Sequence, residues 1–164
     1  MTVIVADAGP LIGFARIGKI DMIRHLFHSV LIPQQVFDEI TVAGEKPGAK
    51  VISEAVTSGW LKIVKIQHNK LTTELSALVD MGEAEAIQLS LERNASLLLI
   101  DDKKGRKVAR KFGVTIIGTG GVLLKSKKHG LINQISFTLS DLAKAGYRIS
   151  SALCNKILEL ADEI

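Results

Sequence analysis

A chain of 164 residues, 47% of them hydrophobic, predicts a single domain over residues 1–164 with a sizeable core. One cysteine and 4% aromatic residues exclude an internal disulfide, a cysteine-rich zinc site and base stacking as the main mode of nucleic-acid binding, while the net charge of +4 is compatible with a polyanionic partner. No signal peptide is evident and no apolar run approaches the roughly 20 residues of a membrane span, so we expect a cytoplasmic protein without a membrane partner.

Short apolar runs bounded by turn residues are predicted to be strands. They are residues 2–6, 29–32, 61–66, 97–100 and 114–117. The segments between and after them have helical spacing. They are residues 10–19, 21–27, 33–42, 47–58, 70–79, 82–92, 103–112 and 120–129. Strands that alternate with helices form βαβ units, so we expect an α/β fold with a central, mainly parallel sheet of about five strands.

Residues 131–164 are predicted to form a C-terminal helical extension. Its two helices are expected at 140–146 and 150–163. In the second one, Leu153, Ile157, Leu160 and Ile164 recur at helical spacing and give one apolar face, a pattern that more often belongs to a core than to an interface.

Acidic side chains lie at the ends of two predicted strands and within or at the start of two predicted helices. They are Asp7, Glu39, Glu83, Glu85, Asp101 and Asp102. The carboxyl ends of parallel strands meet at one edge of a sheet, and carboxylates gathered there repel each other unless a cation lies among them. Hard oxygen ligands suit Mg²⁺ or Mn²⁺. The pattern therefore predicts a metal-dependent site that cleaves phosphodiesters.

Each acidic residue also has a purely structural interpretation. Asp7 could cap the helix that follows it. Glu39 could be solvated, although its neighbours Val36 and Ile40 place it beside an apolar face. Acids in a first helical turn suit the helix dipole, which would explain Glu83. Glu85 is offset from Glu83 by about 200° and is expected at the surface or in support of the metal ligands.

The pair Asp101 and Asp102 follows the most apolar strand, and one of them can enter the site while the other caps the next helix. Spacing leaves open which does which. The basic residues directly behind them could hold an RNA backbone or form an ordinary solvated face. They are Lys103, Lys104, Arg106 and Lys107. Thr119, in a glycine cluster after the last strand, is expected to cap a helix or to support the metal ligands as a hydrogen-bond donor.

Taken together in order and spacing, five motifs resemble the PIN domain, and in particular its short prokaryotic branch related to VapC toxins. The motifs are residues 5–12, 36–40, 82–87, 98–102 and 116–121. The resemblance implies a three-layer α/β/α fold and a metal-dependent endoribonuclease. It also implies that one or two Mg²⁺ or Mn²⁺ ions are held by Asp7, Glu39, Glu83 and one of Asp101 and Asp102. The family pattern Thr-x-Asp favours Asp102, whereas the position at the strand end favours Asp101.

The same resemblance implies a biological role and partners. Short members of the family are often toxins neutralised by a small antitoxin, and they are often homodimers. We therefore expect an RNA substrate, a small antitoxin and a second copy of the chain as partners. One alternative is a catalytically inactive module that binds RNA or protein. A receiver-type phospho-acceptor is disfavoured, because a lone Asp7 follows the first strand and no lysine follows the last.

Overall fold

The computed structural model describes residues 2–42 and 48–164, and in these residues it has a five-stranded sheet whose neighbouring strands are all parallel. The strands lie in the order β3-β2-β1-β4-β5. They are β1 (Ile4–Ala6), β2 (Val30–Pro33), β3 (Leu61–Val64), β4 (Leu97–Leu99) and β5 (Ile116–Ile117). The predicted parallel sheet of about five strands is confirmed.

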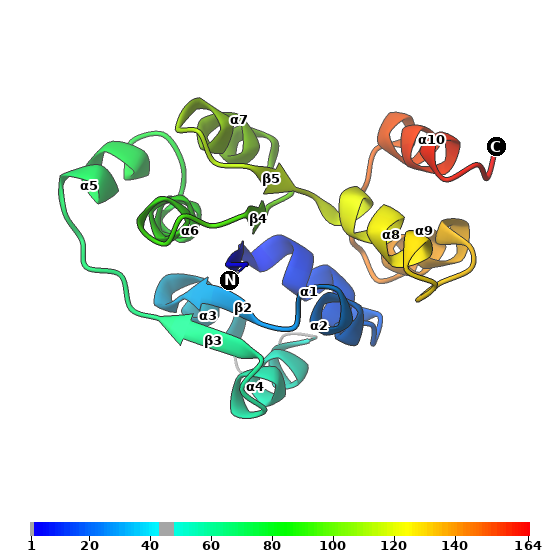
Figure 1. Ribbon diagram of the computed structural model, residues 1–164, viewed down its shortest axis with the longest axis horizontal. Helices are drawn as coiled ribbons and strands as arrows, with labels where there is room; N and C mark the ends of the chain where they lie inside the picture. Colours follow the sequence, from blue (N-terminus) through cyan, green and yellow to red (C-terminus); the bar gives the residue numbers. More distant parts are fainter. Residues whose placement is uncertain (1, 43–47) are drawn as a thin grey trace.

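Helices connect the strands and cover both faces of the sheet (Figure 1). They are α1 (Ala8–Arg16), α2 (Asp21–Phe27), α3 (Gln34–Thr41), α4 (Ala49–Thr57), α5 (Lys70–Ser76), α6 (Met81–Glu92), α7 (Lys103–Lys111), α8 (Thr119–Lys128), α9 (Ile135–Lys144) and α10 (Ser151–Leu160). Residue 47, at which the helix 47–58 is expected to start, lies outside the described residues. No helix within the described residues combines the length and the apolar content needed to cross a bilayer.

Two hydrophobic cores lie on opposite faces of the sheet. Alternate residues of β1 divide between them, with Ile4 and Ala6 in the core beneath α1, α2 and α4 and Val5 in the core beneath α5, α6 and α7. In the same way, Leu99 of β4 belongs to the first core and Leu98 to the second. A strand buried on both faces reads as a continuous apolar run, which is why these strands could be recognised. The three-layer α/β/α fold is confirmed.

The chain changes direction across the sheet between β1 and β4. From β1 it runs outward through β2 to β3, and then returns by way of α5 and α6 to pair β4 with the other side of β1. Ala6 is in register with Leu99, and the N–H of Asp7 donates to the carbonyl of Leu99 at 2.8 Å. Ligands of open parallel sheets bind at the carboxyl ends of the strands beside such a switch point. Asp7 and the pair 101–102 follow these two strands.

The C-terminal helices differ from the prediction in two respects. Helix α9 begins at Ile135 rather than at residue 140, because the carboxylate of Glu163 accepts the N–H groups of Ile135 at 2.7 Å and Ser136 at 3.0 Å. These are N–H groups that a helix start leaves without an intrahelical partner. On α10, Ile157 is buried, but Leu153 is 49% and Leu160 62% exposed. The expectation that this apolar face belongs to the core is therefore wrong for these two residues.

Helix α9 packs against α1 and α8, and α10 packs against α8 and α9. Buried residues of both helices join the core beneath α1, among them Ile135, Leu142 and Ile157. The two C-terminal helices thus share a hydrophobic core with the first part of the chain, and the loop between them reaches the carboxyl edge of the sheet.

Candidate functional site

Asp7 is buried at the carboxyl end of β1, with 7% of its surface exposed. It occupies the position before α1, but its side chain makes no capping hydrogen bond to that helix. The pKa of Asp7 is raised to about 7, chiefly by burial and also by the charges of Asp80, Glu39 and Asp102, while a hydrogen bond from the backbone N–H of Ala8 lowers it in part. The capping interpretation therefore does not account for Asp7.

Glu39 is half-buried on α3 and faces the start of α6. A methyl group added at Gly82 would lie 2.5 Å from Oε1 of Glu39, so a residue without a side chain is needed for this close approach. Burial and the charge of Asp80 raise the pKa of Glu39, against the lowering effect of hydrogen bonds with Gln35 and with the Gly82 backbone. A solvated glutamate would not be in contact with α6 in this way.

Glu83 lies in the first turn of α6 and is 7% exposed. Its N–H donates to Oδ1 of Asp80 at 2.8 Å, and the N–H of Asp80 donates back to Oε2 of Glu83 at 3.2 Å, which forms a capping box. Burial raises the pKa of Glu83 to about 8, with further contributions from Asp80, Asp102 and Asp7. A methyl group added at Gly105 would lie 3.0 Å from Oε1 of Glu83, so α7 also approaches this carboxylate closely.

The two adjacent aspartates after β4, Asp101 and Asp102, have different neighbours. Asp102 is exposed and caps α7, because its Oδ2 accepts the N–H of Gly105 at 2.9 Å. Its charge is among those that raise the pKa values of Asp7 and Glu83. One side chain thus both caps the helix and faces the other acids, two roles that the sequence had assigned to different residues.

Asp101 is held by three donors, none of which belongs to the other acidic residues. The Thr119 N–H donates to Oδ1 at 2.7 Å, the Thr119 hydroxyl donates to Oδ2 at 2.5 Å, and the Tyr147 hydroxyl also donates to Oδ2. Thr119 is 2% exposed and begins α8, whereas Gly118 occupies the capping position. The carboxylate of Asp101 is therefore fixed between α8 and the loop that joins α9 to α10.

Asp80 and Tyr147 are site residues that the sequence interpretation missed. Asp80 stands three residues before Glu83, and the pattern Asp-x-x-Glu before an apolar run is a recognisable capping box. Nothing local marks Tyr147, because it lies 46 residues from Asp101 in the chain.

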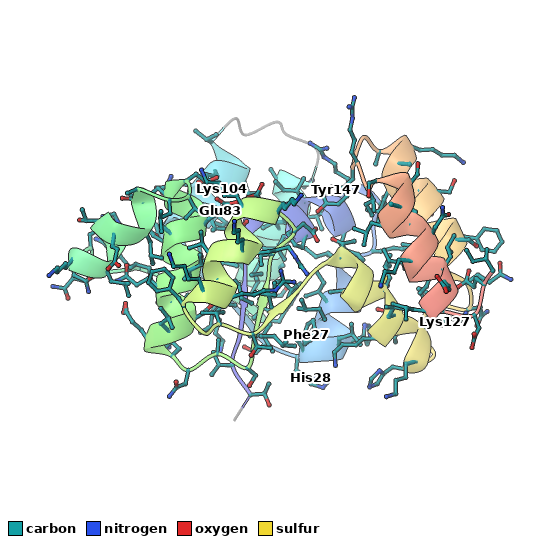
Figure 2. All side chains as sticks on the ribbon, turned by 90° about the horizontal axis from the view of Figure 1, so that it is seen from above. Phe27, His28, Glu83, Lys104, Lys127 and Tyr147 are labelled. Atoms are coloured by element: carbon teal, nitrogen blue, oxygen red, sulfur yellow. The ribbon has the colours of Figure 1, made fainter. Side chains whose placement is uncertain are left out.

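We refer to five carboxylates as the acidic cluster. They are Asp7, Glu39, Asp80, Glu83 and Asp102. Glu83 lies on the same edge of the molecule as Lys104 and Tyr147, opposite Phe27 and His28 (Figure 2). In the described residues the ion pairs are His68–Glu85 and Lys127–Glu163, so no member of the acidic cluster has a basic partner there.

The acidic cluster has the donor chemistry of a site for a hard divalent cation. Its ligands would be carboxylate oxygens, and the raised pKa values of Asp7 and Glu83 show that their charged forms are disfavoured, by burial first and by the neighbouring acids second, with no basic partner among the described residues. Across residues 2–42 and 48–164, however, no three acidic, histidine or cysteine side chains converge closely enough to surround one ion. The residue types fit Mg²⁺ or Mn²⁺, and the side chains must turn inward to bind it.

Glu85 does not lie at the surface, contrary to that part of its prediction. It is 5% exposed, its Oε2 lies 2.6 Å from Nε2 of His68, and its Oε1 accepts the N–H of Gln35 at 3.4 Å. Helix α6 is buried between the sheet, α3 and α5, so even a residue turned well away from Glu83 is covered. Glu85 thereby connects α6 to α3 beside the acidic cluster.

The basic residues of α7 lie on more than one side of that helix. Lys103, Lys104 and Lys107 are exposed, whereas Arg106 is half-buried and its Nη1 donates to the carbonyl of Ile100 at 2.8 Å. Burial and the neighbouring Arg110 lower the pKa of Arg106, an effect that the charge of Asp101 opposes. These side chains make the surface next to the acidic cluster cationic.

No curated protein matches the chain. Among protein families, the PIN domain matches residues 3–163, a span that begins just before β1, ends three residues after α10 and includes both C-terminal helices. Because the match covers nearly the whole sequence, the chain belongs to the PIN domain family, whose fold is of the nuclease type.

Proposed function

We propose that this protein is a metal-dependent endoribonuclease that hydrolyses phosphodiester bonds of RNA and acts as the toxin of a toxin–antitoxin pair. The observation that carries the proposal is the acidic cluster, in which buried carboxylates with raised pKa values lie at the switch point of the sheet without a basic partner among the described residues. Perturbed carboxylates in such a position are typical of catalytic and metal-binding sites.

Mg²⁺ or Mn²⁺ would be held by Asp7, Glu39, Glu83 and Asp102, with Asp101 next to them in the chain. A divalent ion of this kind activates water and stabilises charge that develops on a phosphate. In the absence of a cation, Asp7 and Glu83 retain protons near neutral pH, because burial disfavours their charged forms. Lys103, Lys104, Arg106 and Lys107 supply positive charge for the RNA backbone.

The test is cleavage of a mixed RNA panel with Mg²⁺, with Mn²⁺ and with chelator, by wild type, Asp7→Asn and Asp21→Asn. Asp21 is an exposed aspartate of α2 and serves as the matched control. We expect cleavage that requires metal, falls at least about 100-fold in Asp7→Asn and is unchanged in Asp21→Asn. Retained, metal-dependent cleavage by a clean Asp7→Asn preparation would contradict the proposal.

A second candidate is a catalytically inactive module that binds RNA or protein. It is favoured by the hydrogen bonds that occupy Asp101 and by the spread of the other carboxylates, since no three acidic side chains of the described residues converge on one point. Folded protein that binds Mn²⁺ and RNA but shows no turnover on the panel would favour this candidate over the nuclease.

The toxin proposal includes a small antitoxin and a homodimer. Apolar side chains at the C-terminal end of the molecule support a protein partner, because Leu160 is 62% and Ile164 75% exposed. Light scattering coupled to size-exclusion chromatography measures the oligomeric state of the chain alone. Co-expression with a small protein encoded beside it tests whether a complex forms and whether cleavage is then suppressed.

A further inference from the structure

A cavity of about 450 Å³ lies beside the acidic cluster, between α7, the start of α8 and the loop joining α9 to α10. Its size is within the range of pockets that hold small organic ligands, roughly 300–1,000 Å³. Four basic side chains line it, namely Lys103, Arg106, Arg110 and Arg148. The one acidic residue in its wall is Asp101, whose carboxylate already accepts hydrogen bonds from Thr119 and Tyr147. The cavity is therefore strongly cationic.

Helical spacing explains which basic residues of α7 reach the cavity. Positions 103, 106 and 110 are separated by three and four residues and lie on one face of the helix. Lys107 and Lys111 lie about 40° and about 80° around the helix from Lys103, on the side away from Arg106, and they do not line the cavity. The fourth cation, Arg148, comes from the C-terminal part of the chain, so the cavity exists only because α9 and α10 pack against α8.

The remaining wall combines an aromatic ring, aliphatic side chains and hydroxyl groups. The ring of Tyr147 lies against α1, where a methyl group added at Gly13 would be 3.1 Å from it, so the glycine makes room for the ring. Ile149 and Leu153 add apolar surface, and Ser150 adds a hydroxyl group. Arginine forks match the geometry of phosphate oxygens, and an aromatic and apolar wall suits the face of a base or sugar. This is the chemistry of a site for a nucleotide.

The cavity and the acidic cluster are contiguous. Asp101 lines the cavity and precedes Asp102 of the cluster in the chain. On the other side, a methyl group added at Gly9 would be 3.6 Å from the Tyr147 hydroxyl, and Gly9 is two residues from Asp7. Glu83, Lys104 and Tyr147 accordingly lie along one edge of the molecule (Figure 2).

We propose that this cavity binds one nucleotide of the RNA strand, with its phosphate held by Lys103, Arg106, Arg110 and Arg148, next to the bond that is cut at the acidic cluster. The proposal rests on the proposed function for the identity of the strand. It gives the C-terminal segment a direct part in substrate binding, through Arg148 and Tyr147, in addition to its part in the core.

The test measures RNA binding in the presence of chelator, so that no cleavage occurs. The variants Arg110→Gln and Arg148→Gln each remove one cation from the cavity. Their matched controls are Lys111→Gln, the next residue of α7, and Lys144→Gln, an exposed lysine at the end of α9; neither lines the cavity. The probes are a 5′-hydroxyl RNA hexamer, the same hexamer with a 5′-phosphate, and a nucleoside 5′-monophosphate.

We expect each cavity variant to bind RNA about tenfold more weakly, and the slope of log K against log salt to fall by about 0.7, the value for one lost phosphate contact with a single strand. The two controls should leave both quantities unchanged. A loss seen with the 5′-hydroxyl hexamer identifies an internal phosphate as the ligand. A loss confined to the phosphorylated hexamer and the monophosphate identifies a terminal phosphate, and either result supports the cavity as a nucleotide site.

Equal losses in cavity variants and controls, or no loss in any variant, would overturn the proposal. Failure of the nuclease proposal is recognised separately, because it depends on the Asp7→Asn cleavage assay and not on binding in chelator. Circular dichroism of all four variants verifies that they are folded. Arg110 and Arg148 are exposed, so we expect their substitution to leave the spectrum unchanged.

Discussion

Two regions of this protein bury carboxylates, and their pKa values shift in opposite directions. Glu83 in the acidic cluster is 7% exposed and has a pKa of about 8. The side chain of Glu163, at the C-terminal end, is 9% exposed and has a pKa of about 2. Burial raises the pKa in both places. Burial is the largest cause of the raised pKa of Glu83, and its acidic neighbours add to it, whereas the neighbours of Glu163 reverse the effect of burial.

The neighbours of Glu163 are donors. The N–H groups of Ile135 and Ser136 and the ammonium of Lys127, which lies 3.0 Å from Oε2, outweigh the effect of burial on the pKa of Glu163. The neighbours of Glu83 are the acids Asp80, Asp102 and Asp7. A carboxylate that is satisfied by donors stabilises the fold, whereas one surrounded by acids stores repulsion that a cation can relieve.

The largest effect that distinguishes the two regions is the dependence of stability on pH. The folded-state pKa values of Asp7 and Glu83 are raised, from 3.8 to about 7 and from 4.5 to about 8, so their contribution to stability is lost as pH rises through these values. Between pH 5 and 8.5 these two shifts cover about 5 pKa units in all, which at about 1.4 kcal/mol per unit sets an upper limit of about 7 kcal/mol. Because the two carboxylates titrate as a coupled pair, their effects do not add in full, and we expect chelator-treated protein to be roughly 2–4 kcal/mol less stable at pH 8.5 than at pH 5. Urea unfolding at the two pH values measures this.

Glu163 contributes with the opposite sign. Its folded-state pKa is lowered from 4.5 to about 2, so its stabilisation is present above pH 4.5 and is lost as pH falls toward 2. Addition of Mn²⁺ at pH 8.5 should recover most of the stability lost by the acidic cluster, because the ion offsets the repulsion. Equal stability at pH 5 and 8.5 in chelator would mean that the cluster is not strained by its own charge.

The second effect is a loss of stability in Glu163→Gln, which removes the carboxylate that accepts hydrogen bonds at the C-terminal end. The neutral amide cannot reproduce the charge-assisted bonds to Ile135, Ser136 and Lys127, each of which then pairs less well. We expect the free energy of unfolding at pH 7 to fall by about 1.5–3 kcal/mol in urea titrations. Glu159→Gln, at an exposed glutamate of α10, is the control and should change stability by less than about 0.5 kcal/mol.

The third effect is a gain in stability, in contrast to the loss expected for Glu163→Gln. In chelator at pH 8.5, Asp7→Asn should be about 1 kcal/mol more stable than wild type, because it removes one of the mutually repelling charges. The gain should shrink at pH 5, where Asp7 is already protonated. Thermal unfolding of wild type, Asp7→Asn and the control Asp21→Asn at both pH values measures it. A variant that is less stable than wild type at pH 8.5 would assign Asp7 a structural role instead.

Continuous apolar runs were sufficient to predict β1, β2 and β4, since a strand buried on both faces has no polar alternation to confuse with a loop. Residues 61–66 were predicted from their alternation instead, and β3 ends at Val64. The start of α9 was not predictable in this way. The donors of its first turn are satisfied by Glu163, at the far end of the chain, and no local pattern marks a cap supplied from that distance.

In the site, too, residues marked by local sequence could be predicted, whereas those positioned by distant parts of the chain could not. Asp7, Glu39 and Glu83 could be selected because each lies where an apolar element meets a turn or helix. The choice between Asp101 and Asp102 could not be made, because Thr119 and Tyr147, which hold Asp101, are brought to it by tertiary packing. Glu85 was expected at the surface or in support of the metal ligands because it is offset by about 200° from Glu83. The surface position is wrong because α6 is covered by the sheet and by two helices.

The smallest effect concerns the space that α6 leaves for Glu39. In Gly82→Ala the new methyl group would lie 2.5 Å from Oε1 and 2.8 Å from Oε2 of Glu39, so the end of that flexible side chain must move. Stability should change by less than about 1 kcal/mol, since alanine is also the better helix former. Mn²⁺ affinity, measured by calorimetry, should fall about tenfold.

A double-mutant cycle shows whether this loss acts through Glu39. If Gly82→Ala weakens Mn²⁺ binding only by displacing that carboxylate, then Gly82→Ala combined with Glu39→Gln should bind no more weakly than Glu39→Gln alone. Additive losses would mean that the methyl group disturbs the start of α6, and with it Asp80 and Glu83, rather than the approach of α3. Because Glu39 is the one member of the acidic cluster on α3, the cycle also measures how far metal binding depends on the packing of α3 against α6.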